Sequence, residues 1–276
     1  MAVAERSKTY DSGLKRSRAL EELSDAFRYR HLIFQLSRRD VLTRYKRSIL
    51  GVAWTMLNPL GMMIVLSVAF SQIFEGTRAY PAYVITGLVA WNFFAQTTTS
   101  AMNQMVWGGG LLSKIYIPRT VFVLSSIGTG LVNITLSLVP LLLVLVLTGI
   151  KITTAFLFLP ISVFFLAIFS LGVGLILSTW AIYFYDVTEM YQIVLIAWMY
   201  LTPIIYPEEI VPEWISTWLF TINPMYHLVE IFRAPLYGGV IPDTNNIIAA
   251  ASMSLLALVA GWIMFARRSD EFAYRV

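Results

Sequence analysis

The chain has 276 residues, of which 58% are hydrophobic and only 13% charged, and its mean hydropathy is +0.70. One soluble core cannot bury that much apolar surface, so the composition predicts an integral membrane protein and excludes an ordinary soluble domain. The lack of cysteine excludes disulfides, iron–sulfur clusters and thiolate chemistry, and the two histidines, His31 and His227, are too far apart in sequence to suggest a metal site.

The net charge of +4 comes from cations that crowd before the first apolar span. Cations in that position fit lipid headgroups and the orientation of a first span better than they fit nucleic acid. We therefore expect membrane lipids as partners and no nucleic-acid partner. Residues 1–19 are polar and poor in large apolar groups, which predicts a disordered cytosolic tail without a cleavable signal peptide.

Residues 20–48 are predicted to form a cytosolic interface helix and the membrane boundary. Apolar residues recur at helical spacing from Leu20 to Leu36, interleaved with charged residues. Two interpretations stay open: an amphipathic helix that lies on the inner membrane surface, or a helix that packs on the rest of the chain. The arginines predicted to meet anionic lipid or an acidic partner are Arg28, Arg30, Arg38, Arg39 and Arg44.

The step from water to bilayer is predicted at residues 38–60, RRDVLTRYKRSILGVAWTMLNPL, where a basic run becomes apolar within a few residues. About twenty apolar residues cross a hydrocarbon core, and on that basis the sequence predicts an all-α membrane protein with six spans in a domain over 49–266. The predicted spans are Ile49–Phe74, Tyr83–Val106, Thr120–Thr148, Thr154–Tyr183, Tyr191–Tyr206 and Ile247–Ala266.

The distribution of Lys and Arg tests this topology independently of hydropathy. With six spans and both termini in the cytosol, residues 267–276 form a cytosolic tail and 17 of the 20 cations lie inside. The three outside are Arg78, Lys151 and Arg233. Such a bias is typical of cytosolic segments and predicts a cytoplasmic-membrane protein in that orientation.

Two connections between spans are unusual. Residues 108–119, GGGLLSKIYIPR, form a short element bracketed by glycines and Pro118, which is either a small surface helix or an ordinary connection. Residues 207–246 are long for a connection and too apolar for a solvated loop. Their short apolar pieces, broken by proline, predict re-entrant helices over 207–233. Glu230 and Arg233 share a helical face there and can pair, either as a structural salt bridge or in gating.

The predicted spans hold almost no ionisable residues but many aromatic ones. Ion-coupled carriers keep charged groups at mid-membrane, so their absence disfavours that class. Aromatic faces can contact sugar rings, although any single ring is better explained as an interfacial or lipid-facing residue. The candidates for a glycan path are Trp91, Phe93, Phe94, Tyr191 and Trp198.

No enzyme motif is present: the sequence lacks GxxxxGK[ST], HExxH and GxSxG. The chain therefore holds no Walker phosphate loop, and any uphill transport must draw its energy from another polypeptide. We expect no cofactor or metal in this chain, with ATP and Mg²⁺ on the partner.

The basic-to-apolar run at 38–60 resembles that of the polysaccharide-exporting permeases of the second ABC exporter type, which include O-antigen and wall teichoic acid exporters. The resemblance continues in chain order and covers most of the sequence after residue 20. The runs that carry it further are YPAYVITGLVAWNFF (80–94), KIYIPR (114–119), TPIIYP (202–207), NPMYHLVEIFR (223–233) and FARRSDEFAYRV (265–276).

The resemblance implies a homodimer of six-span subunits in the bacterial inner membrane, each docked on a separate nucleotide-binding ATPase, that exports a lipid-linked polysaccharide. It implies an ATPase-coupling element at Leu111, Lys114, Tyr116, Pro118 and Arg119. It also implies outer gate helices, with Pro203, Tyr206, Pro207, Asn223, Pro224, Glu230 and Arg233 as gate residues.

Two alternatives remain at this stage. A permease of the same architecture could carry a drug or a lipid. A membrane enzyme acting on polyprenyl-linked sugars would need paired carboxylates, for which only Asp40, Asp186 and Glu189 lie near the cytosolic ends of the spans.

Overall fold

The computed structural model describes residues 22, 27–46, 48–107 and 118–269, and within these ranges it contains helices and turns but no strand. The α-helices are α2 (Arg30–Tyr45), α3 (Ala53–Phe70), α4 (Tyr80–Trp107), α6 (Thr120–Leu147), α7 (Leu159–Tyr183), α8 (Val187–Leu201), α9 (Glu213–Ile222), α10 (Pro224–Arg233) and α11 (Thr244–Arg268). Three short helical turns join them: η1 (Thr154–Phe158), η2 (Glu208–Ile210) and η3 (Ala234–Gly238).

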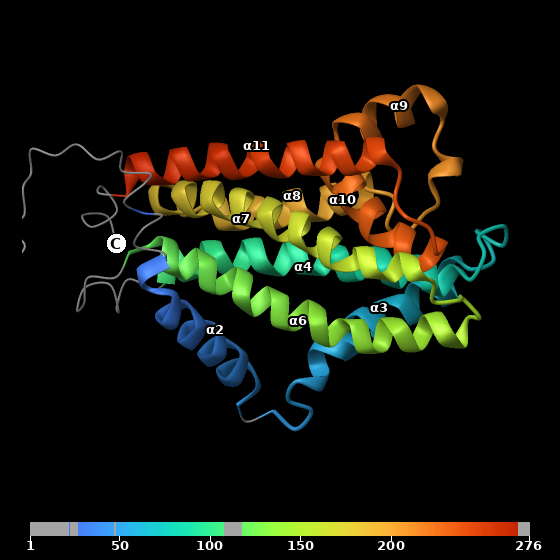
Figure 1. Ribbon diagram of the computed structural model, residues 1–276, viewed down its shortest axis with the longest axis horizontal. Coiled ribbons are helices and arrows are strands. Elements are labelled where there is room, and N and C mark those ends of the chain that lie inside the picture. Colours follow the sequence, from blue (N-terminus) through green and yellow to red (C-terminus); the bar gives the residue numbers. More distant parts are fainter. Residues whose placement is uncertain (1–21, 23–26, 47, 108–117, 270–276) are drawn as a thin grey trace, which may run out of the picture.

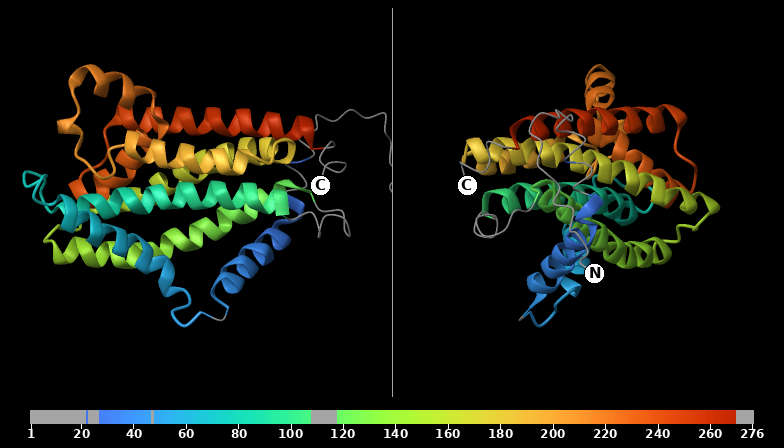
Figure 2. Two further views of the ribbon diagram at one scale, coloured as in Figure 1. Left: turned by 180° about the vertical axis from the view of Figure 1, so that it is seen from behind. Right: turned by 60° about the vertical axis from the view of Figure 1, so that its left-hand side comes forward.

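The long helices α4, α6, α7, α8 and α11 run side by side (Figures 1 and 2). One end of this bundle holds the start of α2 and the end of α11, and we call it the terminal end. The opposite end, the far end, holds the start of α4 and the short helices α9 and α10 (Figure 1). Helices α2 and α3 diverge from the bundle and meet at residues 46–52, which we call the elbow.

In the described part of the chain, four helical segments are long and apolar enough to cross a membrane: Ala53–Phe70, Thr120–Leu147, Thr154–Tyr183 and Thr244–Arg268. All four fall on spans that the sequence predicts, and their ends agree within four residues. The other two predicted spans correspond to α4 and α8. Helix α4 has 28 residues but carries a polar stretch at 96–104, and α8 has only 15 residues.

The polar stretch of α4 is explained by its position in the centre of the chain. Helix α4 packs against α3, α6, α7, α8 and α10, so most of its side chains meet protein. Thr86 donates to the Tyr83 carbonyl at 2.7 Å and Thr98 to the Phe94 carbonyl at 2.8 Å, whereas the buried Thr97 hydroxyl has no hydrogen bond and Gln96 and Asn103 are exposed. Polar groups satisfied in this way do not need water at membrane depth.

Helices α7 and α11 form the tightest crossing of the bundle. A Cβ at Gly172 would overlap backbone atoms of Ala257 and Leu258 in α11, and a Cβ at Gly261 would overlap the Gly172 carbonyl. Small residues that bring two backbones into contact are the usual way for helices to associate in a bilayer. The missing side chains of these two glycines therefore fix how closely α11 approaches α7.

Helix α2 differs from the sequence prediction in its extent. The prediction ends the interface helix near Leu36, whereas α2 continues through the basic run to Tyr45. No Pro or Gly interrupts residues 30–45, so the helix has no reason to stop where the charge increases. The basic run therefore lies on a helix, and the apolar helix α3 begins after the elbow.

One face of α2 packs on the bundle and another stays free. Leu36 and Ser37 are buried, and the Ser37 hydroxyl donates to the Ser125 carbonyl of α6 at 2.9 Å. Phe34 and Leu42 point outward with 65% and 58% of their surface exposed. Helix packing, one of the two interpretations of this segment, accounts for the buried face, and lipid contact of the outward face stays a prediction.

Candidate functional site

The connection after α8 crosses the far end and is held there by two tyrosines at the start of α4. The Tyr80 hydroxyl donates to the Ile205 carbonyl at 2.7 Å. The Tyr83 hydroxyl lies 3.1 Å from the carbonyl oxygens of both Pro203 and Tyr206. Because these contacts join residues more than 100 positions apart, they fix the loop at 202–207 over the end of the bundle.

Arg233, at the end of α10, is buried beneath this loop. Its side chain is 6% exposed, and it donates from Nη1 to the Tyr83 hydroxyl at 3.0 Å and from Nη2 to the Pro203 carbonyl at 2.9 Å. The guanidinium lies over the Tyr83 ring, 3.8 Å from its centroid. A Cβ at Gly87 would come within 2.7 Å of Nη2, so a glycine in α4 makes room for it. Charge-assisted hydrogen bonds and a cation–π contact thus tie α4, α10 and the loop together.

Asn223 and Pro224 form the boundary between α9 and α10. The Asn223 Oδ1 accepts from the Met225 backbone N–H at 3.1 Å, which caps α10, and Pro224 occupies the first turn, where it needs no hydrogen-bond donor. The same Oδ1 accepts from Trp198 Nε1 at 2.7 Å, and Nδ2 donates to Thr202 Oγ1 at 3.0 Å. This asparagine therefore couples the short helices to α8.

The residues predicted for an outer gate come together at the far end. Pro203 and Pro207 are buried, and Tyr206 donates to the Tyr200 carbonyl at 3.0 Å. Glu230 lies 3.9 Å from Arg233 Nη1, so the predicted pair forms, but at the limit of an ion pair. Tyr80 and Tyr83 also belong to this far-end cluster, but the sequence did not predict them. A tyrosine at the start of a span is usually interpreted as an ordinary interfacial residue.

Burial raises the pKa of the Glu230 carboxyl above its ordinary value of 4.5, and the neighbouring Glu208 and Glu209 add to the rise while Arg233 opposes it. A raised pKa in the folded state means that the protonated form fits the fold better than the ionised form. This contribution to stability is present below pH 4.5 and is lost as the pH rises through the higher, folded-state pKa.

Glu230→Gln is therefore expected to leave the thermal midpoint near its parent value at pH 4 and to raise it at pH 7. Gln copies the neutral acid, so it removes the cost that ionisation imposes on the parent at neutral pH. Thermal unfolding of both proteins in detergent across this range measures the effect. A difference between the two proteins that is the same at both pH values would contradict the assignment.

The rings predicted to line a glycan path lie in the interior of the chain. Trp198 of α8 packs against Trp91 and Phe94 of α4, with ring centroids 6.3 Å and 5.3 Å away, and the Tyr191 hydroxyl is 2.6 Å from Thr98 Oγ1. Phe93 is also buried and borders a small cavity between α3, α4 and α6. In the single chain these rings contact one another, so their role in a path stays a prediction.

At the terminal end the structure describes only part of the predicted coupling element. Leu111, Lys114 and Tyr116 lie outside the described residues. Pro118 is buried and Arg119 partly exposed at the start of α6, and the neighbouring Thr120 donates to Glu22 Oε2 at 2.9 Å.

Most of the predicted cytosolic-interface arginines are exposed on α2 or just before it. Arg28, Arg30, Arg38 and Arg39 are exposed, and the side chain of Arg44 lies outside the described part. Asp40 accepts from Arg39 Nη2 at 3.0 Å and from Gln104 Nε2 of α4 at 2.7 Å. Asp40 therefore connects α2 with the bundle.

Among the residues that the structure describes, the acids at the terminal end form no cluster suited to catalysis. Asp186 and Glu189 lie at the start of α8, whereas Asp40 is engaged by Arg39 and Gln104. Within the described residues no three His, Cys, Asp or Glu side chains group as metal ligands would. This arrangement gives no support to the enzyme alternative.

Comparison with known proteins gives a consistent result along nearly the whole chain. The sequence is 30% identical over 252 residues to the O-antigen export system permease protein RfbA of Myxococcus xanthus, covering 90% of this chain and 96% of that protein. It is 22% identical over 237 residues to the polysialic acid transport protein KpsM of Escherichia coli, covering 84% and 91% of the two chains.

A third relative is the capsule polysaccharide export inner-membrane protein CtrC of Neisseria meningitidis, at 23% identity over 248 residues, or 87% of this chain and 92% of that one. The sequence pattern of the ABC-2 type transporters matches residues 31–237, from the start of α2 to the end of the far-end cluster. The chain belongs to the ABC-2 type transporter family.

Proposed function

We propose that this chain is the membrane-spanning subunit of an ATP-driven exporter that moves a lipid-linked polysaccharide out of the cytosol. The observation that carries the proposal is its similarity, over more than four fifths of its length, to three proteins named for O-antigen export, polysialic acid transport and capsule polysaccharide export. The chain contains no Walker phosphate loop, so the nucleotide-binding ATPase, with its ATP and Mg²⁺, is a separate polypeptide.

The proposed topology has six spans, with α4 and α8 as the second and fifth, in the bacterial cytoplasmic membrane. Helix α4 is long enough to cross, and neighbouring helices bury part of its polar stretch, with Gln96 and Asn103 exposed. Helices α9 and α10 have ten residues each, about 15 Å, and enter from the far end without crossing. Arg28, Arg30, Arg267 and Arg268 all lie toward the terminal end, which supports a cytosolic position for both termini.

Two copies are proposed to enclose the path, because α3 and α8 leave apolar faces uncovered in the single chain. Val65 and Val68 of α3 are 63% and 79% exposed, and Met190 and Ile193 of α8 are 63% and 70% exposed. A second copy and lipid can share these faces. In this proposal α8 moves away from α4 during transport, which separates Trp198 from Trp91 and Phe94. The uncovered rings then contact the glycan.

ATP binding and hydrolysis on the partner are proposed to act through the coupling element at 111–119 and the basic α2. We expect the double charge reversal Lys114→Glu/Arg119→Glu to abolish export while the protein inserts normally. The introduced glutamates would face a groove of the ATPase that is complementary to cations. The two negatively charged surfaces would therefore repel each other. Export of glycan to the cell surface and ATPase activity of the purified complex are the measurements.

The matched control is Lys151→Glu, a reversal of an exposed cation at the far end of the bundle. It should leave both activities near the parent level. Unchanged export in the double variant, with normal insertion, would overturn the assignment of the coupling element. Export by the chain reconstituted without an ATPase would overturn the proposed function itself.

A further inference from the structure

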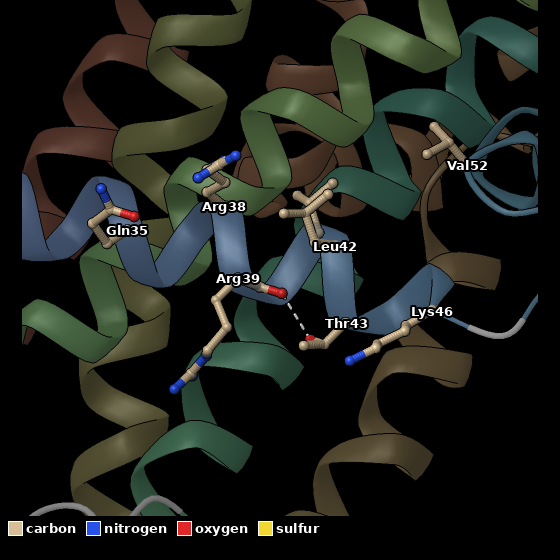
Figure 3. A pocket seen from close by; sticks show the side chains of 8 residues that line it. Gln35, Arg38, Arg39, Leu42, Thr43, Lys46 and Val52 are labelled. Carbon is tan, nitrogen blue, oxygen red and sulfur yellow. Dashed lines mark hydrogen bonds between the residues drawn. The ribbon is translucent and has the colours of Figure 1, made fainter.

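A groove runs along the outward surface of α2 and reaches the elbow. Its volume is about 630 Å³, and it is lined by Gln35, Arg38, Arg39, Val41, Leu42, Thr43, Lys46 and Val52. Figure 3 shows the side chains in two rows on α2, with Gln35, Arg38 and Leu42 in one and Arg39, Thr43 and Lys46 in the other. Cations thus border the groove from both sides, and Val52 forms its end beside α3.

The three cations of the groove differ in what engages them. Arg39 bonds to Asp40, with Nε and Nη2 at 3.2 Å and 3.0 Å from Oδ1. Arg38 and Lys46 are exposed, and neither side chain has a hydrogen bond or an ion pair with the described residues. Two unpaired cations and one paired cation leave the groove with a net charge of about +2, so it favours an anion.

The apolar surface beside the groove indicates a ligand that carries an apolar part as well as a negative charge. Leu42 is 58% exposed within it, and Ile49 of the elbow is fully exposed. The elbow lies part-way along the bundle, at the start of the span α3, and not beyond the bundle's end (Figure 1). Cations that border apolar side chains at the start of a span are the arrangement that binds lipid headgroups.

We propose that this groove is a binding site for the phosphate of an anionic membrane phospholipid, held by Arg38 from one row and Lys46 from the other. The acyl chains leave past Leu42, Val52 and Ile49 into the bilayer. A soluble phosphate would make no contact with the apolar side chains beside the groove. An acidic protein surface would bind the cations but leave the apolar side chains of the elbow exposed to water. The site does not depend on the proposed transport function.

The test uses the full chain, purified in mild detergent and titrated with phosphatidylglycerol while native mass spectrometry counts bound lipid. We expect Arg38→Gln/Lys46→Gln to raise the half-saturating concentration about thirtyfold, and each single variant about fivefold. Phosphatidylcholine, which has no net charge, should bind the parent weakly. Asp40→Asn should tighten phosphatidylglycerol binding, because it releases Arg39 into the groove.

The matched control is Arg267→Gln/Arg268→Gln, which removes two exposed cations of α11 outside the groove and should change the half-saturating concentration less than about twofold. An equal loss in this control would show diffuse attraction and overturn the site. Equal binding of phosphatidylcholine, or unchanged binding in the groove variants, would do the same. Competition by glycerol phosphate would assign a soluble ligand instead. Displacement at equimolar undecaprenyl diphosphate would assign the polyprenyl carrier and overturn the phospholipid assignment.

Discussion

Gly172→Val is expected to abolish the folded bundle, so that no monodisperse protein is recovered from the membrane. The first side-chain carbon would overlap backbone atoms of Ala257 and Leu258, and a backbone cannot turn aside as a side chain can. Gly172→Ala adds only that carbon and should cost about 3 kcal/mol, the upper end of overpacking effects. Thermal unfolding and elution of the purified protein in detergent are the measurements.

Gly61→Ala in α3 is the matched control, because a Cβ there has no atom within 4 Å. It should leave the midpoint unchanged or raise it slightly, since alanine favours a helix more than glycine does. Gly261→Val should repeat the loss at Gly172, because its Cβ would overlap the Gly172 carbonyl from the other side of the crossing. A stable, monodisperse Gly172→Val protein would show that α11 does not lie so close to α7.

The positions of the spans could be predicted from the sequence because the length of an apolar run directly reflects the thickness of a bilayer. The third span is predicted at Thr120–Thr148, and α6 occupies Thr120–Leu147. Helix α4 shows where this logic weakens. Its polar stretch at 96–104 lowers the hydropathy, although central packing makes those residues compatible with membrane depth. The hydropathy of a segment contains no information about which helices pack around it.

The far-end cluster could be predicted only in part. Proline spacing indicates short, broken helices over 207–233, and the structure has α9 and α10 there. The partners of Arg233 could not be predicted, because Tyr83 lies 150 residues away in sequence and no local pattern connects the two. Sequence analysis assigned to Arg233 only its neighbour on the helix, Glu230, which proves to be the weaker contact at 3.9 Å.

The second large effect is expected from Arg233→Gln, which should lower the free energy of unfolding by about 3 kcal/mol. Two hydrogen bonds from a charged group are lost, each of a kind that contributes about 1.5–3 kcal/mol, and the guanidinium no longer covers the Tyr83 ring. Arg233→Lys keeps the charge but not the planar guanidinium, so its free energy of unfolding should lie between those of the parent protein and Arg233→Gln. Thermal unfolding in detergent measures all three proteins.

Arg268→Gln is the matched control, because that arginine lies over the Tyr183 ring, 4.9 Å from its centroid, but is exposed at the end of α11. It should shift the midpoint little. Tyr83→Phe separates the two contributions of the tyrosine: it keeps the ring beneath Arg233 and removes the hydroxyl that also donates to the loop. We expect about 2 kcal/mol from that loss, because the hydroxyl also accepts the bond from Arg233 Nη1.

The same variants distinguish a structural from a gating role for this cluster. If Arg233 only stabilises the far end, export in cells falls in step with the amount of folded protein across Arg233→Lys, Tyr83→Phe and Arg233→Gln. If the loop at 202–207 must open and close for transport, Tyr83→Phe changes export per folded molecule, because it weakens the hold on Pro203 and Tyr206. A midpoint for Arg233→Gln equal to that of Arg268→Gln would contradict both roles, since the buried guanidinium would then hold nothing in place.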